Sequence, residues 1–184
     1  MIAGHLGVAL AARSLRHDAR LVWLLAAAIA PDLADGVFAL VKFCSPNGTY
    51  SHSIPASVVL AGMAAGSTLI LTRNRGAAAV VGTVVLSHLP LDLITGEKVL
   101  WPGGFVHGLY LYRFPIWDFV VELPVVVVGW LLLRRSGDGP RWAMSVATVV
   151  ALLLLQAAAD LAKPYPVPML QSACEVPAAS PATN

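Results

Sequence analysis

Two apolar runs joined by a short basic loop decide the fold. Residues 54–72 read IPASVVLAGMAAGSTLILT, residues 73–76 read RNRG, and residues 77–96 read AAAVVGTVVLSHLPLDLITG. Each run has about the 20 mostly apolar residues that a helix needs to cross about 30 Å of hydrocarbon. The stretch therefore predicts two membrane-spanning helices with a tight connection that carries Arg73 and Arg75.

The composition of the whole chain agrees with a membrane protein. Of its 184 residues, 58% are hydrophobic and only 12% are charged, whereas a soluble domain carries about 25% charged residues. The net charge is only +2. Too few polar side chains are present to cover a water-soluble globule, which excludes a soluble enzyme domain, a disordered chain and a nucleic-acid-binding protein with a basic face.

Further apolar runs complete a predicted all-α, polytopic helical bundle. Residues 116–133 and 142–161 are long enough to span, and residues 21–41 form a fifth run that is interrupted by Pro31-Asp32-Leu33-Ala34-Asp35. Residues 1–15 are apolar but too short to span, so they predict a helix that enters part of the bilayer or lies at its surface. We expect one transmembrane domain of about five spans over residues 1–161, followed by a Pro-rich tail over residues 162–184.

The distribution of basic residues predicts the orientation. The loops 13–20, 73–76 and 134–141 lie on one side if five spans alternate, and they hold eight Arg; the opposite loops and the tail hold four basic residues. Loops rich in Lys and Arg face the cytoplasm. The tail and the loops 42–53 and 97–115 are therefore expected outside, where Cys44 and Cys174 can form a disulfide if their geometry allows it.

Ionisable residues are unusually frequent in the predicted spans. Three pairs occur at helical spacing, and two more histidines lie in or beside apolar runs: Asp32 with Asp35, His88 with Asp92, Asp118 with Glu122, His5 and His52. Measured along the helices, most of them lie roughly 6 to 14 Å below the outer surface. Such residues are costly in a membrane and by default mark a functional site. We expect Asp118, which lies close to the interface, to be solvated, as well as His17 and His107 in loops.

Imidazole and carboxylate groups together are the usual ligands of Zn²⁺ and related divalent ions. The expected metal ligands are His5, Asp32, His52, His88 and Asp92. Asp35 and Glu122 are the expected catalytic residues, as a general base or as orienting partners. Two structural alternatives stay open: a hydrogen bond between helices for His88 and Asp92, and capping of a broken helix by Asp32 and Asp35.

The order of the motifs resembles a family of bacterial inner-membrane, metal-dependent hydrolases typified by a LexA-regulated protein (YdjM-like), with motifs similar to those of zinc phospholipase C. The resemblance covers roughly residues 2–125 and rests on these motifs: Gly4-His5, Pro31 to Asp35, Tyr50-Ser51-His52-Ser53, Ser87-His88 with Asp92, Leu100-Trp101-Pro102, Arg113 to Ile116, and Glu122. It implies an inner-membrane protein with a metal site. Where that family often has a first histidine, this chain has Asn47, which favours one ion over two.

These observations predict a membrane-embedded hydrolase that uses a divalent metal, with Zn²⁺ favoured by the ligand types, on an ester or phosphoester near the outer face. The expected partners are the lipid bilayer and an amphiphilic, lipid-like substrate, with no nucleic acid. The expected location is the bacterial inner membrane, with several spans and the tail facing outward. Two other functions remain open, namely a metal or proton transporter and a non-catalytic scaffold subunit.

Overall fold

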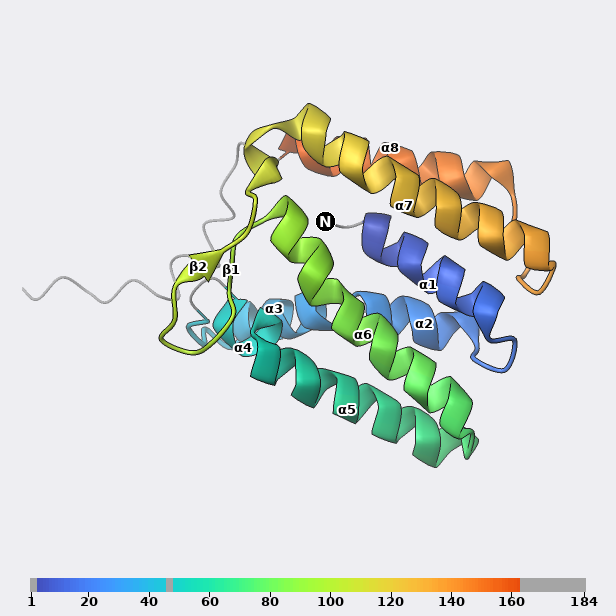
Figure 1. The fold of residues 1–184 in the computed structure, drawn as a ribbon, viewed down its shortest axis with the longest axis horizontal. Coiled ribbons are helices and arrows are strands. Elements are labelled where there is room, and N and C mark those ends of the chain that lie inside the picture. Colours follow the sequence, from blue (N-terminus) through green and yellow to red (C-terminus); the bar gives the residue numbers. More distant parts are fainter. Residues whose placement is uncertain (1–2, 46–47, 163–184) are drawn as a thin grey trace, which may run out of the picture.

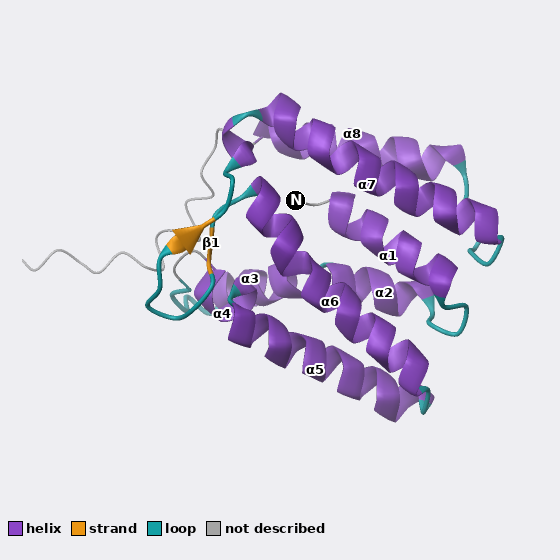
Figure 2. Ribbon diagram, in the orientation of Figure 1, coloured by secondary structure: helices purple, strands orange, loops and turns teal. Residues whose placement is uncertain are grey.

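The computed structural model describes residues 3–45 and 48–162, which form a bundle of helices with one small hairpin (Figures 1 and 2). The elements are α1 (Ala3–Leu15), α2 (Leu21–Ala28), α3 (Ala30–Leu40), α4 (Thr49–His52), α5 (Ile54–Thr72), α6 (Arg75–Thr95), β1 (Lys98–Val99), β2 (Val106–His107), a 3₁₀ turn (Leu111–Arg113), α7 (Pro115–Ser136) and α8 (Val146–Ala162). The two strands pair antiparallel, with Lys98 opposite His107. The predicted all-α class is confirmed.

The helices α5, α6 and α7 are long and apolar enough to cross a membrane. The α2–α3 pair adds a fourth candidate span that is bent by 54°. Pro31 explains the bend, because it cannot donate to the Ala27 carbonyl and its ring crowds that oxygen. α8 is apolar but shorter; it begins at Val146 and not at Trp142, since residues 141–144 form a turn. Five complete spans therefore remain a prediction.

The three Arg-rich loops meet at one end of the bundle, opposite the hairpin (Figure 1). Asn74 Nδ2 donates to Asp18 Oδ2 at 2.7 Å, which joins the first loop to the second. Arg13 Nη2 donates to the Asp138 carbonyl at 2.8 Å, which joins the first loop to the third. This grouping agrees with alternating spans, while the side of the membrane on which it lies stays a prediction.

The short helix α1 lies inside the bundle, which excludes a position at the membrane surface. Its two sides pack in two hydrophobic clusters, one with α2, α5 and α6 and the other with α7 and α8. Glycines allow the close approach of α1 and α7: a Cβ on Gly129 would lie 2.0 Å from the Gly7 carbonyl oxygen, and one on Gly7 would lie 2.7 Å from that of Val125. The packing fixes the depth of His5, which is buried.

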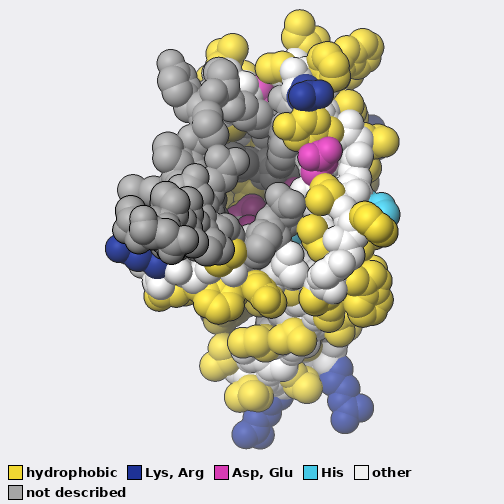
Figure 3. Space-filling view, turned by 90° about the vertical axis from the view of Figure 1, so that its left-hand side faces the viewer, with side chains coloured by type: hydrophobic (Ala, Val, Ile, Leu, Met, Phe, Trp, Pro, Cys, Tyr) yellow, Lys and Arg dark blue, Asp and Glu magenta, His cyan; other side chains and the backbone are white. Residues whose placement is uncertain are grey.

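The hairpin end of the molecule combines apolar and acidic side chains. Hydrophobic side chains cover much of this end, and acidic side chains show between them (Figure 3). Trp101 and Phe105, in the turn between β1 and β2, are 59% and 87% exposed. Of the two cysteines, Cys174 lies outside the described residues, as does most of the Pro-rich tail.

Candidate metal centre

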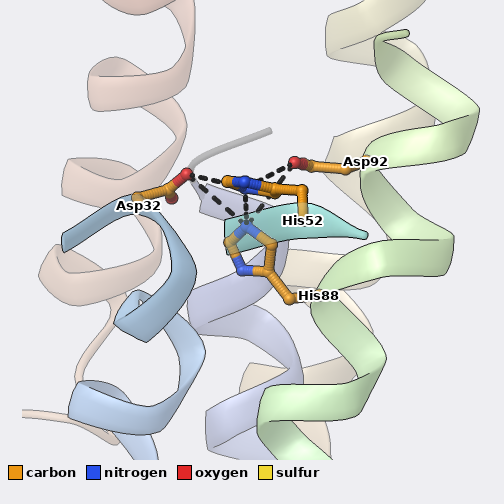
Figure 4. Close-up of side chains that lie close together, drawn as sticks. All are labelled: Asp32, His52, His88 and Asp92. Carbon is orange, nitrogen blue, oxygen red and sulfur yellow. Dashed lines mark hydrogen bonds and ion pairs between the residues drawn. The ribbon is translucent and has the colours of Figure 1, made fainter. Parts of the chain in front are cut away.

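Four side chains from three helices converge in the half of the bundle next to the hairpin (Figure 4). Asp32 lies in the first turn of α3, directly after the bend. His52 is the last residue of α4. His88 and Asp92 lie one turn apart on α6, on the same face of the helix. One ligand atom from each of the four lies within 4.8 Å of the others. We call these residues the group of four.

Five of the six distances between the ligand atoms of the group of four are short and similar, and all six are within 4.8 Å. His52 Nε2 lies 3.2 Å from His88 Nε2 and 3.2 Å from Asp92 Oδ2. Asp32 Oδ1 lies 3.4 Å from His52 Nε2 and 3.5 Å from His88 Nε2. His88 Nε2 lies 3.5 Å from Asp92 Oδ2. A tetrahedral zinc site with bonds of about 2.0–2.1 Å would separate its ligand atoms by about 3.3 Å.

The other ring nitrogen of each histidine has a partner that accepts hydrogen bonds. His88 Nδ1 lies 2.8 Å from the carbonyl oxygen of Ala28, the last residue of α2. His52 Nδ1 lies 3.3 Å from Asp35 Oδ2 and 2.7 Å from Ser51 Oγ, and the Ser51 hydroxyl donates to Asp35 Oδ1. In their neutral form, both rings therefore carry the proton on Nδ1 and direct the Nε2 lone pair into the centre.

These assignments leave four acceptors facing one another. With both rings neutral, the two imidazole lone pairs and the two carboxylate oxygens cannot satisfy each other, because none of them donates a hydrogen bond, whereas a protonated ring would donate from Nε2 to Asp32 or Asp92. A cation between them removes the conflict, and nitrogen and oxygen donors of this kind suit Zn²⁺ and other first-row divalent ions. The residues present thus fit a divalent metal ion.

His5, the fifth expected ligand, lies beside the group of four and not in it. Its Nε2 contacts Asp92 Oδ1 at 3.0 Å, the carboxylate oxygen that faces away from His52 and His88. Its ring stacks on that of His88, with centroids 3.6 Å apart and planes 13° from parallel. His5 therefore orients one member of the group and covers another.

The two expected catalytic carboxylates lie in different surroundings. Asp35 contacts Nδ1 of His52, the ring nitrogen that is not shared with the group of four. Glu122 is fully buried and its Oε2 accepts from the Gly4 amide at 3.1 Å, so it caps the first turn of α1. Asp118 was expected to be solvated, and this is wrong: it is 0% exposed, because α7 turns it toward the interior of the bundle. The loop residues His17 and His107 are exposed as expected.

Three partners of the centre were not found from the sequence. Ser51 precedes His52, but a serine in a short polar segment gives no sign that it contacts a carboxylate from another helix. The Ala28 carbonyl is a backbone group and leaves no sequence pattern. Lys98, whose Nζ lies 3.1 Å from Asp92 Oδ2, follows the spans in a loop where basic residues are usually solvated.

The comparisons with known proteins agree with the resemblance in the motifs. Residues 1–163 match the model of one family, described as the YdjM inner membrane protein family. Neither the comparison with curated proteins nor that with solved structures gives a match. The matched segment contains every residue of the centre and all of the described bundle. The chain therefore belongs to the YdjM family of inner membrane proteins.

Proposed function

We propose that the protein is a membrane-embedded, metal-dependent hydrolase that cleaves an ester or phosphoester bond of a lipid-like substrate near the outer face of the membrane. One observation carries this proposal: the Nε2 atoms of two histidines and the oxygens of two carboxylates converge inside an apolar bundle. With both rings neutral, the centre opposes acceptors to acceptors, and a bound divalent ion would remove this conflict.

The exposure of the four side chains indicates where a substrate can approach. The side chain of Asp32 is 47% exposed, while those of His52, His88 and Asp92 are 3% exposed or less. The centre thus reaches the surface at the start of α3. A substrate that enters there from the membrane would be amphiphilic, with its scissile bond at the level of the polar headgroups.

The residues around the centre would hold and orient the ligands. A divalent ion bound there supplies a Lewis acid that polarises an ester or phosphoryl oxygen and lowers the pKa of water. Asp35 and Ser51 fix the ring of His52, and the Ala28 carbonyl fixes that of His88. The contact of Glu122 with α1 supports a positioning role for Glu122, since α1 carries His5.

A scaffold function is the second candidate, and the number of ligands favours it. Four protein ligands can complete a tetrahedral site, as in structural zinc centres, whereas catalytic centres keep a position for water. In that case the ion would only join α3, α4 and α6. The exposure of Asp32 favours the hydrolase, because a purely structural ion needs no opening.

Metal analysis combined with hydrolysis assays tests both candidates. Wild-type protein, His88→Ala and the control His107→Ala would be purified, loaded with Zn²⁺, and assayed with p-nitrophenyl butyrate and bis(p-nitrophenyl) phosphate. We expect wild type and the control to retain zinc and to hydrolyse one of the two probes, and His88→Ala to lose both properties. Zinc retention without hydrolysis would support the scaffold. No uptake of Zn²⁺, Mn²⁺ or Ni²⁺ would refute the metal site.

A further inference from the structure

Lys98 is a charged residue at the centre that the proposed roles do not use. It lies on β1, in a hairpin that backbone hydrogen bonds fix on two sides. Ile54 N donates to the Leu100 carbonyl at 3.0 Å, at the start of α5, and Leu109 N donates to the Leu93 carbonyl at 2.9 Å, in the last turns of α6. The hairpin is thus anchored to α6, the helix that carries two members of the group of four.

The ammonium of Lys98 contacts the group of four directly. Its Nζ lies 3.1 Å from Asp92 Oδ2, the same oxygen that faces His52 and His88 at 3.2 and 3.5 Å. An ion that takes this oxygen competes with Lys98 for it. Because an ammonium has three N–H donors and no acceptor, Lys98 then has donors available for another anion at the edge of the centre. The side chain is 16% exposed, so it reaches solvent.

The chemistry of the Lys98 ammonium indicates which kind of substrate suits the edge of the centre. Three carboxylates surround the two histidines, those of Asp32, Asp35 and Asp92. A divalent ion bound there would offset two of their three negative charges. A carboxylic ester brings no charge and needs no further cation, whereas a phosphoester brings anionic oxygens that an adjacent ammonium stabilises.

We propose that Lys98 binds the anionic oxygens of a phosphate group held beside the metal ion, so that the substrate is a phosphoester and not a carboxylic ester. The inference rests on the proposed metal-dependent hydrolase and narrows its substrate class. Lys98 would release Asp92 when the metal binds and turn to the phosphate.

Titrations with the metal alone and with inorganic phosphate test this role. The variants are Lys98→Met, the conservative Lys98→Arg, and Lys42→Met as a control that removes the same charge from an exposed position at the same end of the molecule. Each protein is first titrated with Zn²⁺. We expect Lys98→Met to bind zinc at least as tightly as wild type, since the competing ammonium is gone. Weaker zinc binding would mean that Lys98 holds Asp92 in place, and would overturn the proposal.

Each zinc-loaded protein, freed of excess metal, is then titrated with inorganic phosphate by calorimetry. We expect Lys98→Met to bind phosphate about tenfold or more weakly than wild type, because one charge-assisted hydrogen bond is lost. We expect Lys98→Arg and Lys42→Met to bind phosphate nearly as tightly as wild type does. Equal phosphate affinity in Lys98→Met would overturn the role of Lys98 and leave the metal-dependent hydrolase standing. If wild type takes up no zinc, the proposed function fails and this inference fails with it.

Discussion

At the scale of single residues, the two histidines of the centre are fixed by partners of different kinds. His88 Nδ1 faces a backbone carbonyl, which has no proton to exchange, whereas His52 Nδ1 faces the carboxylate of Asp35. The orientation of His52 therefore depends on a side chain that can be replaced. A hydrogen bond from the ring nitrogen that does not bind the metal raises the basicity of a histidine ligand and holds its ring in place.

The substitution Asp35→Asn tests this dependence. The new amide can present either its oxygen or its NH₂ group to His52 Nδ1, so the ring is no longer held in one tautomer. We expect the zinc affinity, measured by competition with a chelator, to fall about 10- to 100-fold while the stoichiometry is unchanged. Asp138→Asn is the matched control, because Asp138 pairs with an exposed histidine, His17, at 2.7 Å. Unchanged affinity in Asp35→Asn would show that Asp35 does not orient His52.

Substitutions of Glu122 can distinguish a role in capping α1 from a role in catalysis. In Glu122→Gln the side-chain oxygen can still accept from the Gly4 amide, so we expect bound zinc and the thermal stability to stay close to wild type. In Glu122→Leu the buried Gly4 amide loses its hydrogen-bond acceptor, and we expect the free energy of unfolding to fall by about 1–3 kcal/mol. Unfolding in detergent and metal analysis give both values. If Glu122→Gln keeps its zinc but loses hydrolysis, Glu122 takes part in the reaction.

At the scale of elements, α1 is the helix whose packing matters most for the centre, because it carries His5 and lies between both hydrophobic clusters. Its contact with α7 has no room for a side chain at Gly129. We expect Gly129→Ala to lower the free energy of unfolding by about 1–3 kcal/mol, the usual cost of overpacking, and to weaken zinc binding by displacing His5.

Gly66 provides the control for this change. A Cβ at Gly66, on α5, would meet nothing within 4 Å. Gly66→Ala should therefore leave the protein unchanged or stabilise it by up to about 1 kcal/mol through helix propensity. Equal unfolding temperatures for Gly66→Ala and Gly129→Ala would mean that α1 and α7 do not approach each other so closely.

The loops at the opposite end give a prediction about pH. The hydrogen bond from Arg16, together with that from Asn74, lowers the pKa of Asp18 from 3.8 to about 2. A carboxylate with a lowered pKa stabilises the folded state above its unfolded pKa, and this contribution is lost as the pH falls through the folded value. We expect Asp18→Asn to unfold at a lower temperature than wild type at about pH 6, where the contribution is complete, and at nearly the same temperature below the folded pKa. A difference that persists in that acidic range would exclude the charge as its cause.

At the scale of the whole molecule, the length and the apolar composition of the runs predicted which helices form, but they did not predict how the helices contact one another. The long apolar runs predicted α5, α6 and α7, because span length is a direct consequence of membrane thickness. Counting residues from the helix ends also placed His52, His88 and Asp92 in one layer. The same counting could not distinguish a metal ligand from a residue that contacts a ligand, as His5 does. It also gave the wrong exposure for Asp118, because the direction in which a side chain leaves its helix depends on the packing of that helix.

The membrane topology can be tested with reporter fusions. Because the Arg-rich loops meet at one end, we expect fusions after Arg75 and Arg135 to report the cytoplasm and fusions after Asn47 and Gly104 to report the outside. Opposite signals at both pairs would place the centre in the inner half of the membrane, and its substrate would then come from the cytoplasmic leaflet.

The bend between α2 and α3 makes one feature of the centre resistant to mutation. Every amino acid carries a main-chain carbonyl, so no substitution at Ala28 can delete the acceptor that faces His88; what a substitution changes is a side chain that is buried in the core. Pro31 is different, because a residue with an N–H group at that position could donate to the Ala27 carbonyl and straighten the helix, which would turn the neighbouring Ala28 carbonyl toward the Asp32 amide and away from His88. The contact with His88 therefore does not depend on the side chain at residue 28 where it is made, but on the residue three positions later, which sets the direction of the carbonyl.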